Sequence, residues 1–171
     1  MRNLVVIFVA VFVLQSCGHS VTDPKPFPIE GVSNSIKVGE LTIAGQPNKQ
    51  ALGTLSGLGY KSVISVRGVG EVKWDEANAA KALGMEYHQA PMGKPLTAIT
   101  DMHVALFNEA MQNATKPVFL HCGSGNRAAA LWAVWLVEHK GMEPKEALRL
   151  AELSGMRSMR VLAEARLDKL R

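Results

Sequence analysis

Residues 118–140 constrain the fold of this 171-residue chain more than any other stretch. A short apolar run (118–121) leads through a loop with two glycines into a long segment rich in alanine and tryptophan. The run predicts a buried strand, and the segment predicts a helix over residues 127–140. A strand that passes through a tight loop into an apolar helix is typical of α/β proteins.

The rest of the chain repeats this alternation. Further strands are predicted at 36–44, 61–66 and 85–89, and further helices at 48–58, 74–83, from 97 or 100 to 113, from 144 onward and at 158–170. Trp132 and Trp135 stand at helical spacing and are expected to be core or sheet-packing residues. We therefore predict an α/β three-layer sandwich, in which helices flank a mainly parallel central sheet, as one domain over residues 35–171.

The N-terminus predicts export. A basic start is followed by an unbroken apolar run at residues 4–14, which is too short to span a bilayer comfortably and reads as a signal peptide over residues 1–16. The segment 14–17 resembles the lipobox at which bacterial lipoproteins are cleaved and acylated on the cysteine, here Cys17. An ordinary cleaved signal, with Cys17 there by chance, is the alternative. Residues 17–34, with three prolines, are expected to form a tether.

This interpretation places the protein on the periplasmic side of a bacterial membrane, held by a lipid anchor. Gly18 after the cysteine favours the outer membrane. If Cys17 carries lipid, Cys122 has no intrachain partner, so a reactive thiol is a plausible reason for its presence.

Charge and composition narrow the possible partners. The formal net charge is only +4, and basic residues form no dense run, so a nucleic-acid partner is not expected. The histidines at 19, 103 and 139 show no metal-ligand spacing, and we predict neither a metal nor another cofactor. The sequence makes no prediction of the oligomeric state.

The loop after the strand at 118–121 carries the candidate chemistry. In parallel sheets, ligands collect where strand ends meet helix starts, and glycines let successive N–H groups face an anion. The helix that follows adds its positive end. Cys122 opens the loop and Arg127 closes it; both the backbone donors and the guanidinium favour a nucleophilic thiolate. An oxyanion is the expected ligand of this loop. The predicted binding residues are Gly123, Ser124, Gly125, Asn126 and Arg127.

The stretch 121–128 is similar to the signature loop of cysteine-dependent phosphatases, in which His-Cys opens a phosphate-binding loop and Arg closes it. Together with residues 44–47, 61–67 and 82–87, it resembles the phosphatase-like domain of the beta-lactamase hydrolase-like proteins, a branch of the dual-specificity phosphatase fold. The resemblance covers roughly residues 36–140.

The resemblance implies roles for single residues. Cys122 is the expected nucleophile, which would form a phosphocysteine, while Arg127 and the loop amides bind the phosphoryl oxygens. His121 is expected to tune the thiolate from outside the pocket, although a purely structural histidine is an equal alternative. Arg67, at the end of a neighbouring strand, is expected either at the pocket or at the surface.

Three departures from the phosphatase pattern stand out. Only four residues separate Cys122 from Arg127, and Ala128 replaces the usual Ser or Thr. The stretch 87–92, which should supply an acidic proton donor, contains no carboxylate. His88 is the nearest titratable group there, and Asp75 or Asp101 from neighbouring loops are other candidates. Without a general acid we expect a slow enzyme.

Two other functions remain open. The four-residue spacing also resembles the active loop of rhodanese-like sulfurtransferases, in which the thiolate carries a persulfide. The missing acid favours a non-catalytic anion-binding lipoprotein. The phosphatase interpretation rests on His121 and on the upstream segments, with a phosphomonoester, including phosphotyrosine, as the expected substrate.

Overall fold

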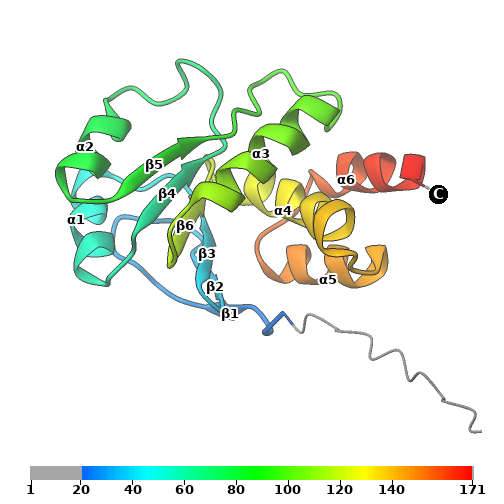
Figure 1. The fold of residues 1–171 in the computed structure, drawn as a ribbon, viewed down its shortest axis with the longest axis horizontal. Helices are drawn as coiled ribbons and strands as arrows, with labels where there is room; N and C mark the ends of the chain where they lie inside the picture. Colours follow the sequence, from blue (N-terminus) through cyan, green and yellow to red (C-terminus); the bar gives the residue numbers. More distant parts are fainter. Residues whose placement is uncertain (1–20, 171) are drawn as a thin grey trace, which may run out of the picture.

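The structure is a computed structural model that describes residues 21–170 (Figure 1). Its strands are β1 (Lys25–Pro26), β2 (Ile36–Val38), β3 (Leu41–Ala44), β4 (Ser62–Ser65), β5 (Glu86–Gln89) and β6 (Val118–His121). Its helices are α1 (Lys49–Gly57), α2 (Glu76–Ala82), α3 (Asp101–Asn113), α4 (Asn126–Lys140), α5 (Pro144–Leu153) and α6 (Arg160–Leu167), with a final 3₁₀ turn at Asp168–Leu170.

The strands of this part of the chain form one sheet in the order β1-β2-β3-β6-β4-β5. The pairs β3–β6, β6–β4 and β4–β5 are parallel, whereas β1 and β2 add an antiparallel edge. Strand β6 therefore lies in the middle, with a parallel neighbour on each side. The predicted fold class, a mainly parallel sheet flanked by helices, is confirmed.

Two apolar clusters lie on opposite faces of the sheet. On one face, α1 and α2 pack over Val63 and Phe119. On the other, α3 and α4 pack over Ile64 and Leu120, and α5 and α6 cover the outer side of α4. The alternation along β6, with Phe119 on one side and Leu120 on the other, explains why an unbroken apolar run was needed: a strand covered on both faces has no polar side.

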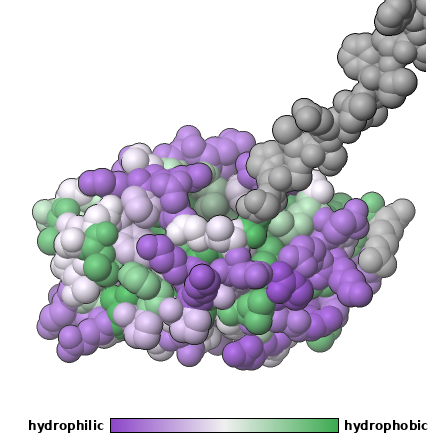
Figure 2. Space-filling model, turned by 90° about the horizontal axis from the view of Figure 1, so that it is seen from below, coloured by the Kyte–Doolittle hydropathy of each residue, from purple (hydrophilic) through white to green (hydrophobic). Residues whose placement is uncertain are grey.

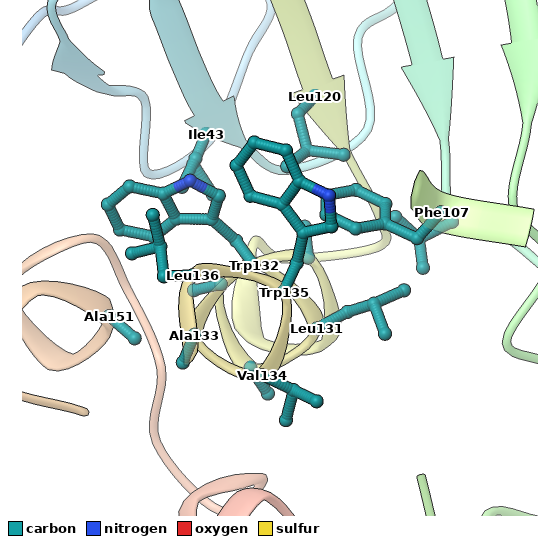
Figure 3. Packing of buried hydrophobic residues seen from close by; sticks show 14 of the residues in the cluster. Ile43, Phe107, Leu120, Leu131, Trp132, Ala133, Val134, Trp135, Leu136 and Ala151 are labelled. Carbon is teal, nitrogen blue, oxygen red and sulfur yellow. The ribbon is translucent and has the colours of Figure 1, made fainter. Parts of the chain in front are cut away.

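The two tryptophans of α4 fill the space between this helix and its neighbours (Figure 3). Trp132 points toward the sheet near Ile43, while Trp135 lies edge-on to Phe107 of α3, with ring centroids 6.1 Å apart. Both tryptophans are buried, and Trp135 Nε1 donates to Asn108 Oδ1 at 3.0 Å. The predicted packing role of both residues is confirmed.

The N-terminal edge differs from the sequence prediction in two ways. The single strand expected at 36–44 is the hairpin β2–β3, because Gly39, with φ +60°, turns the chain back. The expected tether (17–34) is part of the domain from residue 25 onward, since β1 pairs with β2 and Ile29 is buried. Extended, proline-rich chain suits an edge strand as well as a tether. The domain thus begins before residue 35.

Residues 1–20, which contain the predicted signal peptide and Cys17, lie outside the described residues. On the face shown in Figure 2, hydrophilic side chains cover much of the surface, and hydrophobic ones form smaller patches between them. Within residues 21–170, no helix is both long and apolar enough to cross a membrane.

The packing of α3 on α4 gives a stability prediction. Phe107 is fully buried against Trp135, so Phe107→Ala should lower the free energy of unfolding by about 3–5 kcal/mol. Met102 of the same helix is 70% exposed, so Met102→Ala should change it by less than about 0.5 kcal/mol. Urea denaturation of both variants checks this, and equal losses would contradict the packing described.

Candidate active site

Cys122 follows β6 directly, at the edge where the parallel strands end. Its backbone N–H donates to Ala44 O at the end of the adjacent strand β3 (3.3 Å). The loop is fastened on the same side by Gln46 N, which donates to Gly123 O (3.3 Å). Only 1% of Cys122 is exposed, so the protein screens the sulfur from bulk solvent.

Gly125 turns the loop into α4. Its φ of +89° lies in the left-handed region that favours glycine. As the N-cap of α4 it has no side chain with which to bind the N–H groups of the first turn. These donors and the positive end of the helix dipole are therefore available to an anion beside Cys122.

A cavity of about 320 Å³ borders this loop. The predicted residues Cys122, Gly123, Ser124, Asn126 and Arg127 line it together with residues from two other segments: Lys94, Pro95, Leu96, Ser158 and Met159. A larger cavity of about 520 Å³ lies at the opposite end of β6, lined by Val118 and by the C-terminal part of α4. None of the described residues that line this cavity, or a third one of about 800 Å³ over α5 and α6, is a cysteine, serine or threonine, so the cavity at Cys122 is the candidate site.

Arg127 is buried and held firmly. Its Nη1 donates to Glu71 Oε1 (2.8 Å) and to Met92 O (2.6 Å), and its Nη2 donates to Glu71 Oε2 (2.6 Å). The hydrogen bond to Glu71 raises the pKa of Arg127, and the nearby Cys122 sulfur acts in the same direction. The guanidinium is thus fixed in orientation beside the thiol.

Glu71 and Arg67 complete a charged cluster behind the loop. Arg67 Nε lies 3.0 Å from Glu71 Oε2, and Arg67 Nη2 donates to Glu71 O at 2.6 Å. A Cβ placed on Gly123 would come within 3.2 Å of Arg67 Nη1, so Arg67 lies against the loop. Of the two alternatives for Arg67, neither holds: the side chain is largely covered and lies behind the loop, and Arg67 is not among the residues that line the cavity. The hydrogen bond from Arg127 is the main reason that the pKa of Glu71 falls to about 2.

His121 lies on the other face of the sheet from Cys122 and is completely buried. Its ring stacks on Phe119 with centroids 5.8 Å apart. Nδ1 lies 3.3 Å from Cys122 O, and Nε2 lies at an ion-pair distance of 3.3 Å from Glu76 Oε2. His121 therefore contacts the backbone of Cys122 and lies outside the cavity, which is the position expected for it.

The side chain of Asn126 holds the far wall of the cavity. Its Oδ1 accepts hydrogen bonds from Arg157 N (2.7 Å) and Met159 N (3.3 Å), and its Nδ2 donates to Ser158 Oγ (2.8 Å). The backbone N–H of Asn126 and the second N–H of its Nδ2 group are left to bind an anion. The phosphate-binding role of Asn126 stays a prediction.

The candidate general acids are bound elsewhere. His88 Nε2 pairs with Glu86 Oε2 (3.2 Å), Asp75 caps α2, and Asp101 pairs with Arg166. None of these three residues lines the cavity, and none of the described residues that do line it carries a carboxylate. The geometry thus lends no support to His88 as a proton donor.

Sequence reasoning missed both acids of the site, the partly exposed Glu71 and the buried Glu76. Glu71 stands four residues after Arg67, a spacing that hinted at an ion pair, and Glu76 begins a helix, where an acid is common. Neither signal shows that the chain folds these residues back against the cysteine loop, because that requires the long-range pairing of β4 with β6.

A cysteine and an arginine on one loop between a central parallel strand and a helix, beside a cavity, are the arrangement expected of a phosphatase-like α/β protein. The comparison with known families agrees. The chain belongs to the family described as Beta-lactamase hydrolase-like protein, phosphatase-like domain, whose profile matches residues 36–137.

Curated relatives carry the same family description. A beta-lactamase hydrolase-like protein of Agrobacterium fabrum is 38% identical over 106 residues, which are 58% of this chain and 24% of that protein. One of Xylella fastidiosa is 32% identical over 120 residues, 67% of this chain and 27% of the relative. The chain thus spans about a quarter of the length of these relatives.

Solved structures share the fold. A protein of Neisseria meningitidis described as a candidate phosphatase is 25% identical, with a TM-score of 0.58 over 77% of this chain and 94% of the other. P. aeruginosa TpbA, a cysteine-to-serine variant in complex with phosphotyrosine, is 19% identical, with a TM-score of 0.60 over 84% of this chain and 87% of the other. At such identity, TpbA shows similarity of fold.

The ion pair behind the loop gives a prediction on pH. Because Arg127 holds the pKa of Glu71 at about 2 in the folded protein, below the ordinary 4.5, Glu71 stabilises the fold above pH 4.5, and this contribution disappears as the pH falls toward 2. Glu71→Gln should therefore lower the free energy of unfolding at pH 7 by about 1 kcal/mol, a figure reduced for the solvent that still reaches the carboxylate.

Urea denaturation of the two proteins from pH 7 down to pH 2 measures this difference. The gap between them should close below pH 4.5. A gap that stays constant to pH 2 would show that the charge of Glu71 is not responsible.

Proposed function

We propose that this protein is a cysteine-dependent phosphatase that hydrolyses phosphomonoesters through a phosphocysteine intermediate. The observation that carries the proposal is the position of Cys122 and Arg127 on one loop beside the same cavity, at the positive end of α4. A thiolate there would face an anionic substrate that the guanidinium and backbone N–H groups hold in place. Membership of a phosphatase-like family supports the same conclusion.

The reaction has two displacements at phosphorus. The Cys122 thiolate attacks, an S–P bond forms, and the P–O ester bond breaks, with its electron pair leaving on the alcohol oxygen. Water then attacks the phosphocysteine, the S–P bond breaks, and inorganic phosphate leaves while the thiolate is restored. Arg127, held by Glu71, stabilises the charge on the phosphoryl oxygens in both steps.

Protonation of the leaving group is the weak point of this site. Because none of the described cavity residues carries a carboxylate, the departing oxygen takes its proton from solvent. General acid catalysis contributes about 10²–10⁴-fold, so we expect slow turnover and a preference for good leaving groups such as phenols. Phosphotyrosine, a phenol ester, is the biological substrate class that fits, and it is the ligand found in TpbA.

The first test is release of phosphate from an aryl phosphate. We expect Cys122→Ser to abolish it, Arg127→Lys to reduce it by about 10²-fold, and an aryl phosphate to react faster than an alkyl phosphate. Ser56→Ala, at a residue on α1 away from the cavity, serves as the matched control. Absence of any phosphate release that depends on Cys122 would refute the proposal.

The same samples separate the two alternatives. Transfer of sulfur from thiosulfate to cyanide would favour a rhodanese-like sulfurtransferase. The four-residue spacing from Cys122 to Arg127 supports this alternative. Phosphate binding without turnover, unchanged by Cys122→Ser, would favour a non-catalytic anion-binding protein. The lack of a carboxylate among the described residues that line the cavity supports this alternative.

We further propose that the protein is an exported lipoprotein on the periplasmic side of a bacterial membrane, anchored through Cys17. The support is the sequence alone: a basic start, an apolar run and the segment 14–17, which resembles a lipobox. The phosphatase site would then face phosphorylated molecules outside the cytoplasm.

In a bacterial host, Cys17→Ser should move the protein from the membrane fraction to the soluble fraction, because it removes the acylation site. Cys122→Ser, the matched substitution at the other cysteine, should leave the protein in the membrane fraction. Fractionation and intact mass measure both effects. A Cys17→Ser protein that stays on the membrane would argue against the lipid anchor.

A further inference from the structure

The cavity of about 520 Å³ at the start of β6 plays no part in the reaction proposed above. The β2–β3 hairpin, the end of α3, the start of β6 and the end of α4 form its walls. Its apolar lining includes Val38, Leu41, Val118, Trp132 and Leu136, all of which are buried. Cavities of this size and character are typical binding sites for apolar ligands.

The charged residues of this cavity stand at its solvent side. Lys116 Nζ lies 3.6 Å from Glu40 Oε2, and both of these side chains are 64% exposed. Lys140 Nζ lies 4.7 Å above the ring of Trp135. Since the exposed lysine and glutamate neutralise each other and the interior is hydrocarbon, the cavity suits an uncharged apolar chain that enters from the surface.

The N-terminal part of the described chain leads to the same cavity. Val21, the first described residue, lines it and packs against the core cluster that contains Val118 and Trp132. Cys17 stands four residues earlier in the sequence. Four residues span at most about 14 Å even when fully extended, so any group attached to Cys17 begins close to the cavity.

We propose that this cavity binds an acyl chain carried by Cys17 of the same molecule. The inference rests on the lipid anchor proposed above and adds a binding site for it within the folded domain. Because the chain is attached through a short linker, its binding is intramolecular, at an effective concentration in the millimolar range. Burial of the acyl chain against the lining removes apolar surface of both from water.

The position of the cavity gives this binding a consequence for the active site. Val118 begins β6 and lines the acyl cavity, whereas Cys122 follows the other end of the same strand and lines the candidate active site. An anchor seated at the start of β6 holds that end of the domain near the bilayer. The Cys122 cavity then faces away from the membrane, toward dissolved substrates.

A photoreactive acyl chain tests the proposal in the full, unaltered chain. Bacteria that express the protein are supplied with a fatty acid that carries a diazirine near its end, and are irradiated after the lipid has been incorporated. Peptide mapping should then show the lipid of Cys17 crosslinked to a wall of the cavity, within residues 111–118 or 132–142. The product should have the mass of a single chain, because the contact is intramolecular.

Two methionines of α3 provide the matched variants. Met111 lines the cavity, so Met111→Glu places a carboxylate against the acyl chain and should remove most of the crosslink. Met102 of the same helix is 70% exposed and does not line the cavity, so Met102→Glu should leave the crosslink unchanged. Equal yields in the two variants would overturn the proposal.

The other products identify other occupants. Crosslinks of the Cys17 lipid to phospholipid alone, to a second copy of the chain or to a different protein would each overturn the proposal and leave the lipid anchor intact. A Cys17 peptide without lipid would refute the anchor itself, and the inference with it. Failure of the phosphatase function looks different, because the crosslink would form as expected but no phosphate would be released.

Discussion

The pairing of β6 with a parallel strand on each side is the constraint on which the rest of the structure depends. Leu120 is in register with Ile43 of β3 and with Ile64 of β4, so the end of β6 is fixed from both sides. A slip by one residue would exchange the faces of His121 and Cys122. Because the register is fixed, the thiol faces one cluster and the imidazole faces the other.

Because Cys122 and His121 face opposite sides of the sheet, one short connection supplies residues to both sides. The segment between β4 and α2 supplies Arg67 and Glu71 behind the cysteine loop, and the first turn of α2 supplies Glu76 beneath His121. Two carboxylates, Glu71 and Glu76, thus contact Arg127 and His121, the residues on either side of Cys122. A charged group that is fixed before substrate arrives costs no reorganisation during the reaction, so this connection is as much a part of the site as the loop itself.

Much of this arrangement could be predicted from the sequence because it is local. The apolar run of β6, the glycines after it and the caps Asn48 and Thr100 each act within a few residues, and the structure has the elements where these signals put them. The hairpin at Gly39 was missed because an alternating pattern continues through a tight turn. The edge strand β1 was missed because proline-rich extended chain has no periodicity that distinguishes it from a tether.

The remainder depends on contacts between distant residues. Glu71 and Arg127 are 56 residues apart, and Glu76 meets His121 across the packing of α2 on the sheet, so no spacing in the sequence relates them. The same holds for Asn126, whose side chain binds residues 157–159 at the wall of the cavity. The contacts of such side chains can be predicted only when the order of the strands in the sheet is known.

The central claim is that the sulfur of Cys122 attacks phosphorus, and the covalent intermediate tests it most directly. Protein mixed with an aryl phosphate, quenched within the first turnovers and weighed intact should carry one additional phosphoryl group, and peptide mapping should assign it to Cys122. A burst of phenol release with no phosphoryl group on that residue, or a phosphoryl group on another side chain, would contradict the claim.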